Sequence, residues 1–231
     1  MSDNERFQRY VDHKLQLASK LGSGECGGEY SDACVLISAL LSGIAADLYP
    51  GTGMDRRRFV ETWMRYGRPD LSPGNVSLPL LVRRLRRKGK HKEALAIEKL
   101  RPGSFGPGHE SQVLTGANVD VPEDALIRAC PTLTLRAVRD RSYAVVFYEH
   151  VRSTLVHEFH LDNRAAAVPM ASEDSRVSYV NVVHAGSIQR RIHFHLPWLI
   201  ALARSIADGA KEDIRRRPLP LPTRWWIDGN Q

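Results

Sequence analysis

One apolar stretch near the start of the chain constrains the fold more than any other feature. Residues 31 to 48 carry apolar side chains at three- and four-residue steps, and Ser31 or Asp32 is a suitable cap for the start of a helix. Pro50 and Gly51 follow the stretch and should stop the helix there. The apolar residues Val35, Leu36, Leu40, Ile44 and Leu48 recur at these steps, with a flanking Leu41, and the pattern predicts a central core helix.

Most other segments also show helical periodicity. Apolar spacing predicts helices over residues 6–20, 55–67, 78–88, 91–100 and 139–164, and a last helix of about fifteen residues that opens at Pro197. Residues 101–120 are rich in glycine and proline and predict a long loop. Residues 177–183 and 188–195 flank a His-Ala-Gly-Ser turn with apolar residues at even spacings, which predicts a β-hairpin. The expected fold is mainly α, with one β-hairpin inserted before the C-terminal helix.

The length of 231 residues fits one large domain, which we expect over residues 1–217. Residues 218–231 begin with Pro-Leu-Pro-Leu-Pro, which favours an extended Pro-rich tail that projects and carries Trp225 and Trp226. The alternative is that the two indoles dock on the chain's own core or on a second copy.

The charge balance favours an anionic partner. The chain holds 33 Lys and Arg residues against 26 Asp and Glu residues, a net charge of +7, and its arginines cluster at residues 56–58, 83–84, 86–88 and 215–217. Guanidinium groups suit phosphate oxygens, so nucleic acid is a reasonable partner. The alternative is that these clusters are solvated faces of helices.

The sequence favours a cytoplasmic location with no membrane segment. The longest apolar run, residues 34–48, is interrupted by Ser38, Ser42 and Asp47 and looks too short and too polar to cross a bilayer. The first residues have no apolar stretch behind a basic start, as a signal peptide would have. Three cysteines without a CxxC pair argue against a disulfide framework and a thiolate zinc site.

Residues 148–160, Tyr-Glu-His-Val-Arg-Ser-Thr-Leu-Val-His-Glu-Phe-His, hold the strongest candidate site. Histidine can take up and return a proton near neutral pH, and arginine can neutralise charge that builds on a phosphate. Five residues span roughly 500° of helix, which places Arg152 and His157 about 140° apart. The two side chains can therefore converge on a phosphate at a helix shoulder or in a cleft, for instance where two such helices meet.

Arg152-Ser-Thr-Leu-Val-His157 resembles the R-x(4–6)-H motif of the HEPN superfamily (higher eukaryotes and prokaryotes nucleotide-binding). Members are small helical bundles, and many are metal-independent endoribonucleases. The order of elements around the motif also resembles a plasmid- and genome-encoded prokaryotic subgroup with a β-hairpin before the last helix. The likeness covers roughly residues 30–67 and 140–210.

The resemblance implies a homodimer whose motif helices form a composite cleft. His157 would act as general base on a ribose 2′-hydroxyl, or as acid to the leaving oxygen, and Arg152 would stabilise the pentacoordinate phosphate. Glu149 would orient Arg152, and the expected substrate contacts are Ser153, His150 and His160. Single-stranded RNA loops are the expected substrates, because their bases and 2′-hydroxyls are accessible.

The product would carry a 2′,3′-cyclic phosphate, and no cofactor or metal would be needed. The resemblance further implies a toxin- or defence-type role, with an antitoxin or regulatory protein as a partner.

Alternatives remain open at the level of sequence. His157, His160, His193 and His195 could together hold a transition metal, although His157-Glu-Phe-His160 is one residue short of the zinc-protease HExxH spacing. Ser153 stands where active HEPN members often carry Asn, Asp or His, which favours a non-catalytic RNA-binding or dimerisation module. In purely structural roles, Arg152 would pair with Glu149 and His157 would be an interior histidine.

Overall fold

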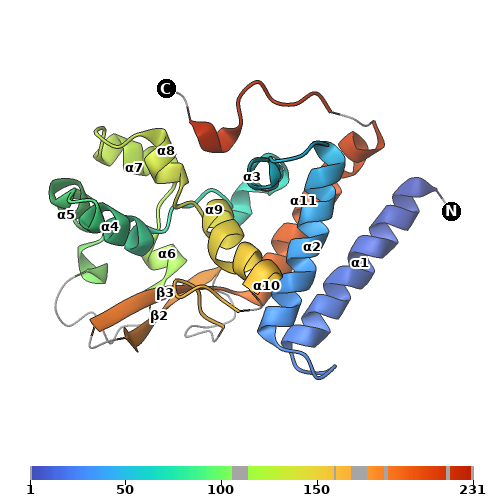
Figure 1. Cartoon of the computed structure of the whole chain (residues 1–231), viewed down its shortest axis with the longest axis horizontal. Coiled ribbons are helices and arrows are strands. Elements are labelled where there is room, and N and C mark those ends of the chain that lie inside the picture. Colours follow the sequence, from blue (N-terminus) through green and yellow to red (C-terminus); the bar gives the residue numbers. More distant parts are fainter. Residues whose placement is uncertain are drawn as a thin grey trace.

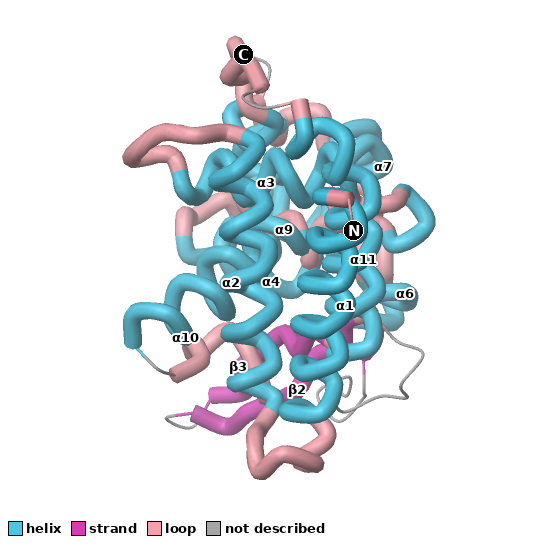
Figure 2. Tube along the Cα trace, turned by 90° about the vertical axis from the view of Figure 1, so that its right-hand side faces the viewer, coloured by secondary structure: helices cyan, strands magenta, loops and turns pink. Residues whose placement is uncertain are grey.

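The computed structural model describes residues 2–105, 114–158, 160–167, 176–184, 187–216 and 219–229. The chain is mainly helical and carries a small antiparallel sheet of three strands, which confirms the predicted class at this level (Figure 1). The helices gather around one apolar core, and the sheet lies at one end of the bundle (Figures 1 and 2).

Three long helices form one side of the molecule. They are α1 (Asp3–Gly22), α2 (Tyr30–Leu48) and α11 (Leu196–Arg215), and each packs against the other two. α2 is the predicted core helix, but its cap is Glu29. The backbone N–H of Glu29 donates to Asp32 Oδ2 over 2.8 Å, which closes a capping box. The expectation that Ser31 or Asp32 is the cap was therefore wrong by two or three residues.

α2 is long and apolar enough, by length and composition, to cross a membrane, and half of the apolar window is buried inside the fold. The helix begins at Tyr30, before the apolar run at Cys34, so the argument that the run is too short does not hold for the whole helix. Its buried side chains pack against α1, α3 and α11, as those of a central core helix do.

Aromatic side chains join the helical side to the sheet. α3 (Asp55–Tyr66) contributes Trp63, whose ring lies 5.2 Å from that of Phe147 in α9 (Tyr143–Phe147). Phe147 meets Phe194 of the sheet edge-on at 5.4 Å, and Phe194 stacks on Trp198 of α11 at 6.0 Å. Large rings at these distances add attraction beyond area burial, so this cluster fixes how four elements meet.

The other side of the molecule consists of shorter helices: α4 (Leu78–Arg87), α5 (His91–Glu98), α7 (Glu123–Ala129) and α8 (Leu135–Arg139) (Figure 1). α4 and α5 confirm two predicted helices. The predicted loop over 101–120 instead contains a 3-10 turn η2 (Pro102–Ser104), the strand β1 (Leu114–Thr115) and the helix α6 (Gly116–Val119). Residues 106–113 of that stretch lie outside the described residues.

The helix predicted over 139–164 is confirmed between Tyr143 and Glu158, but its bounds and its regular α-helical form were wrong. α9 begins after Ser142, whose side chain accepts from the N–H of Val145 and caps the helix. A π-helical turn, η4 (Tyr148–Arg152), links α9 to α10 (Ser153–Glu158). The chain then turns at Asp162, whose carboxylate accepts from the N–H of Arg164 over 2.8 Å. The cap at Ser142 and the turn at Asp162 therefore make the helical segment shorter than its apolar periodicity predicted.

The predicted β-hairpin is confirmed. β2 (Val177–His184) pairs antiparallel with β3 (Ser187–Phe194), from Val177 opposite Phe194 to His184 opposite Ser187. The short strand β1 adds a third member, with Leu114 opposite Tyr179. α11 begins directly after the hairpin, at Leu196, and is longer than the fifteen residues expected.

A buried carboxylate joins the sheet to the helices that lie beside it. Asp120 Oδ2 accepts from the hydroxyls of Tyr143 and Tyr179, each over 2.6 Å, and Oδ1 accepts from the N–H of Leu78 over 3.0 Å. Tyr179 Oη also lies 2.7 Å from Ser77 Oγ. Burial raises the pKa of Asp120 to about 7, although both tyrosine hydrogen bonds lower it. We call these side chains the Asp120 network.

The end of the chain does not project, contrary to the first expectation. Trp225 is 9% exposed and meets Tyr49 edge-on at 5.4 Å. The backbone N–H of Trp226 donates to Glu61 Oε2 over 2.7 Å, and the guanidinium of Arg139 lies 4.6 Å from the centre of the Trp226 ring. The segment crosses the top of the molecule in Figure 1 and packs on α3 and α8, so the indoles dock on the chain's own core.

Candidate functional site

Residues 148–160, which we call the motif segment, contain an irregular turn at the position of Arg152. The N–H of Ser153 donates to the carbonyl of Tyr148, five residues earlier, instead of four as in a regular α-helix. π-Turns of this kind are rare and occur frequently at functional sites. The irregularity therefore marks the segment that the sequence motif singled out.

Arg152 is held against α2. Its guanidinium lies 5.0 Å from the centre of the Tyr148 ring, and its Nε donates to Ser42 Oγ over 3.4 Å. The side chain is half-buried, so it is positioned by these contacts and still reaches solvent. Within the described part of the chain it forms no ion pair with Glu149.

α10 buries Thr154 and Leu155 and exposes Val156, His157 and Glu158. His157 is exposed, and Ser153 is half-buried. His160 lies just beyond the helix, is 64% exposed, and its Nδ1 is 3.5 Å from Glu158 Oε2. Among the described residues no hydrogen bond, ion pair or ring contact joins His157 to Arg152. The structure also rules out the interior role considered for His157.

Glu149 and His150 point away from the motif pair, so two expected roles were wrong. Glu149 was expected to orient Arg152, but its carboxylate accepts from Arg56 over 2.7 Å and from Arg141 over 3.3 Å. His150 was expected to contact substrate, but it is 4% exposed. Apolar periodicity could not reveal these orientations, because the π-turn shifts every side chain within it.

His150 sits between two carboxylates. Its Nε2 lies 3.9 Å from Glu149 and its Nδ1 lies 3.7 Å from Asp162. Burial lowers the pKa of His150 to about 4, against the opposing effect of Asp162. The imidazole is therefore neutral at neutral pH and belongs to the packing behind the site.

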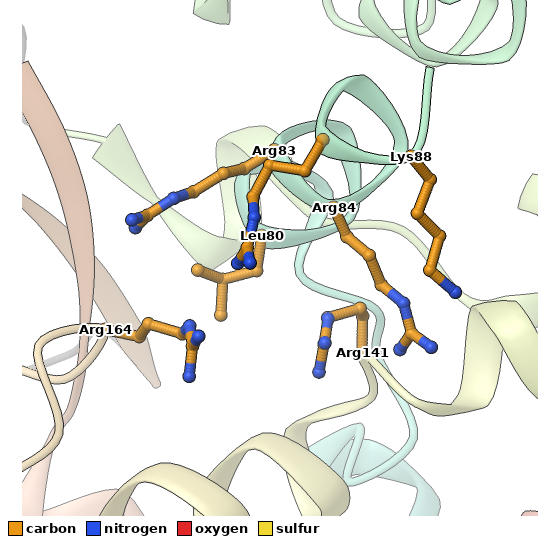
Figure 3. Close-up of a pocket in the computed structure, with 7 residues that line it drawn as sticks. Leu80, Arg83, Arg84, Lys88, Arg141 and Arg164 are labelled. Carbon is orange, nitrogen blue, oxygen red and sulfur yellow. The ribbon is translucent and has the colours of Figure 1, made fainter. Parts of the chain in front are cut away.

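Glu149 and Asp162 pair with Arg141 and Arg164, which line a second candidate site. This site is an open cavity of about 320 Å³ between α4, the residues before α9 and the turn after α10. Its walls are almost entirely basic (Figure 3). We call it the arginine cavity. It is lined by Leu80, Arg83, Arg84, Arg87, Lys88, Arg141 and Arg164.

Three parts of the chain supply these cations. The helix α4 provides three and Lys88 directly after it a fourth, Arg141 precedes α9, and Arg164 follows α10. Figure 3 shows Arg141 and Arg164 approaching the basic side of α4 from below. Arg141 has a side chain 15% exposed, whereas Arg87 and Lys88 are exposed. The cavity therefore has a buried base and an open, positively charged entrance.

Like charges at this site act on one another. Burial lowers the pKa of Arg141, and nearby Arg84 lowers it further. Burial likewise lowers the pKa of Arg83, with additional effects from Arg164 and Arg87. An anion among these groups would oppose both effects, because it favours their charged form.

Sequence reasoning found only part of the arginine cavity. The cluster in α4 was noticed, and Arg83 with Arg87 and Arg84 with Lys88 are four residues apart, which is the spacing of one helix face. Arg86 points elsewhere and pairs with Glu98 over 2.6 Å, as the solvated-face interpretation predicts. Arg141 and Arg164 carry no local signal, because each stands apart in the sequence and joins α4 only through the fold.

The four histidines considered as metal ligands are not arranged as one site. His193 donates from Nδ1 to the carbonyl of Ala166 over 2.8 Å, and His195 Nε2 lies 3.0 Å from Ser178 Oγ. Both are buried, His193 in β3 and His195 directly after it, whereas His157 and His160 are exposed. Over the described ranges, no group of three or more His, Cys, Asp or Glu side chains is placed to hold a metal ion.

Comparisons with protein-family models, with curated proteins and with solved structures find no match to this chain. By its fold, the protein belongs to the class of mainly helical proteins and carries a three-stranded antiparallel sheet.

Proposed function

We propose that this protein is an endoribonuclease of the HEPN type, with Arg152 and His157 in its site and RNA as its substrate. The observation that carries the proposal is the π-turn, which holds Arg152 on α2 one helix turn before the exposed His157. The bundle with a hairpin directly before its last helix also agrees with the resemblance in the sequence. The chain's excess of basic residues suits a polyanionic substrate.

The proposal includes a second copy of the chain, because the HEPN resemblance implies a composite cleft between two motif segments. α2 beside the motif segment carries an exposed face of small and apolar side chains, Val35, Ala39 and Gly43 at four-residue steps. Val156 of α10 is also 38% exposed. Figure 2 shows α10 beside α2 at the outer side of the bundle. We propose that these faces meet in a homodimer and bring two motif segments together.

In the proposed reaction His157 takes the proton of a ribose 2′-hydroxyl, and the 2′-oxygen attacks the adjacent phosphorus. The bond to the 5′-oxygen breaks, and a protonated His157 of the partner subunit returns a proton to that oxygen. Arg152 donates hydrogen bonds to the phosphoryl oxygens as their charge increases. The products are a 2′,3′-cyclic phosphate and a free 5′-hydroxyl.

The test is RNA cleavage by purified protein in the presence of EDTA, with the new ends identified chemically. We expect cyclic-phosphate ends from the native protein and a loss of at least 100-fold in Arg152→Ala and His157→Ala, the order of a general-acid–base contribution. Arg128→Ala and His13→Ala are matched controls, because both residues are exposed on helices away from the motif. Equal binding of RNA by all variants without cleavage would leave the non-catalytic RNA-binding module.

The proposed dimer has its own test. Ala39→Glu places a charge on the exposed face of α2 and should leave the monomer folded, because Ala39 is exposed. We expect the native protein to sediment as a dimer and the variant as a monomer without cleavage activity. Leu95→Glu is the control, since Leu95 is 54% exposed on α5. A native monomer that cleaves RNA would contradict the composite site.

A further inference from the structure

We propose that the arginine cavity is a binding site for a compact polyphosphate, such as the triphosphate of a nucleotide or of an RNA 5′ end. This site is separate from the RNA-cleavage site proposed above, and its existence does not depend on that function. The proposal rests on the shape of the cavity, on its distribution of charge and on the directions from which its cations approach.

The shape suits a small anion chain. The cavity encloses about 320 Å³, which is at the lower end of the range for small-molecule sites. Its cations come from α4, from the residue before α9 and from the turn after α10, so they surround a ligand from several sides. A single phosphate would reach few of them, whereas a chain of phosphates can contact the buried base and the exposed entrance together.

The charge at the cavity is compensated in part. Arg84 pairs with Asp140 over 2.9 Å, Arg141 pairs with Glu149 over 3.3 Å, and Arg164 pairs with Asp162 over 3.3 Å. Arg56 approaches from outside and shares two of these carboxylates, Asp140 over 3.1 Å and Glu149 over 2.7 Å. The three carboxylates of Asp140, Glu149 and Asp162 therefore pair with four arginines, and Arg87 and Lys88 add further positive charge.

Arg87 and Lys88 supply positive charge that no carboxylate among the described residues neutralises. Neither forms an ion pair with any carboxylate among the described residues, and both are exposed at the entrance. The carboxylates that do pair hold the guanidinium groups of the base in position. This arrangement orients the inner donors and leaves the outer cations to a ligand with several negative charges.

Phosphate suits these donors. Guanidinium forks match the geometry of phosphate oxygens and bind them through paired N–H donors. Leu80 is the one apolar residue in the lining, and the remaining apolar surface there belongs to the aliphatic stems of the basic side chains. A ligand recognised mainly through a base or an acyl chain would need a larger apolar wall.

The experiment measures binding of inorganic tripolyphosphate to the full chain at constant ionic strength, by calorimetry. The test variant is Arg87→Ala with Lys88→Ala, and the matched control is Arg86→Ala. Arg86 lies on the same helix and is 55% exposed, but it pairs with Glu98 outside the cavity. All three positions are exposed, so the variants should fold. We expect the native protein to bind, the test variant to bind about tenfold more weakly and the control to change less than about threefold.

Three further ligands separate the sources of the polyphosphate. They are ATP, a short RNA with a 5′-triphosphate and the same RNA with a 5′-hydroxyl. Binding of ATP as tight as that of tripolyphosphate identifies a free nucleotide as the source, and preference for the triphosphate RNA identifies an RNA end. The proposal is overturned if tripolyphosphate does not bind at millimolar concentration, if test and control variants weaken equally, or if the hydroxyl RNA competes for the cavity as well as the triphosphate RNA does.

Discussion

The Asp120 network and the arginine cavity both hold charged groups away from solvent, but the surrounding chain treats them differently. Asp120 is 4% exposed, and its carboxylate accepts from two tyrosine hydroxyls and a backbone N–H. In the cavity, Arg84 and Arg141 share their carboxylates with Arg56, and Arg87 and Lys88 have no such partner in the described structure. A group that the chain satisfies completely stabilises the fold, whereas an excess of one charge at an open cavity is suited to binding a ligand.

Removing the acceptor of the Asp120 network should have the largest effect. Asp120→Ala leaves the hydroxyls of Tyr143 and Tyr179 and the N–H of Leu78 without their acceptor in the interior. We expect the free energy of unfolding to fall by about 4 kcal/mol in urea titrations. Asp124→Ala, at an exposed carboxylate of α7, should change it by less than about 0.5 kcal/mol. Equal effects would show that the network does not stabilise the fold.

Crowding the same network should have the next largest effect. A Cβ at Gly116 would lie 2.2 Å from Tyr143 Oη, which Asp120 holds in place. We expect Gly116→Ala to lower the free energy of unfolding by about 2 to 3 kcal/mol, as overpacking does. Gly209→Ala is the matched control, since a Cβ there would lie 3.4 Å from Tyr66, an ordinary van der Waals distance. That control should stabilise α11 by about 0.5 to 1 kcal/mol, measured by the same denaturant titration.

The pH dependence of stability gives a smaller and signed effect. The pKa of Asp120 is raised by burial from 3.8 to about 7, so the folded state binds this proton more tightly than the unfolded state. The stability from this group is present at low pH and is lost as the pH rises through about 7, with a slope of at most about 1.4 kcal/mol per pH unit.

The comparison of native protein with Asp120→Asn isolates that contribution. Burial lowers the pKa of His150 and of His193 to about 4, so both groups destabilise the fold as the pH falls below 6.5 and oppose Asp120. These histidines remain in the variant, so their effects cancel in the comparison. Between pH 4 and pH 7 the native protein should therefore lose free energy of unfolding relative to Asp120→Asn. A difference that is constant with pH would contradict the raised pKa.

Removing charge from the arginine cavity should have the smallest effect and the opposite sign. Without a polyphosphate, Arg87→Ala combined with Lys88→Ala removes two cations from a basic cluster. We expect the free energy of unfolding to rise by about 0.5 kcal/mol at low salt and the difference to vanish at high salt. Destabilisation at low salt would show that these side chains support the fold as the Asp120 network does.

The fold was predictable where the pattern of apolar residues extends over many turns or alternates strictly. α2, α3, α4, α5 and the hairpin were found from the sequence, since their buried faces repeat with the period of the element. The stretch from 139 to 164 was not predictable in this way. Its apolar residues continue through the cap at Ser142 and through the π-turn, so periodicity could not detect either boundary.

The candidate sites, like the fold, were predictable from the sequence only in part. Arg152 and His157 follow from a short motif, and the basic face of α4 follows from its spacing. The directions of Glu149 and His150 did not follow, because the π-turn and the partners Arg56, Arg141 and Asp162 determine them. Trp225 and Trp226 were clear as unusual residues, but the surface that receives them is built from α3 and α8.

By itself, the sequence determined the helical class, the hairpin before the last helix and the basic character of the chain, because periodicity and charge are local properties. The tertiary structure decided which cations meet. Arg83, Arg141 and Arg164 are far apart in the sequence and line one cavity, because the helices α4 and α9 and the turn after α10 converge there. It also decided that Asp120 is buried among tyrosines from two other elements, which no local pattern encodes.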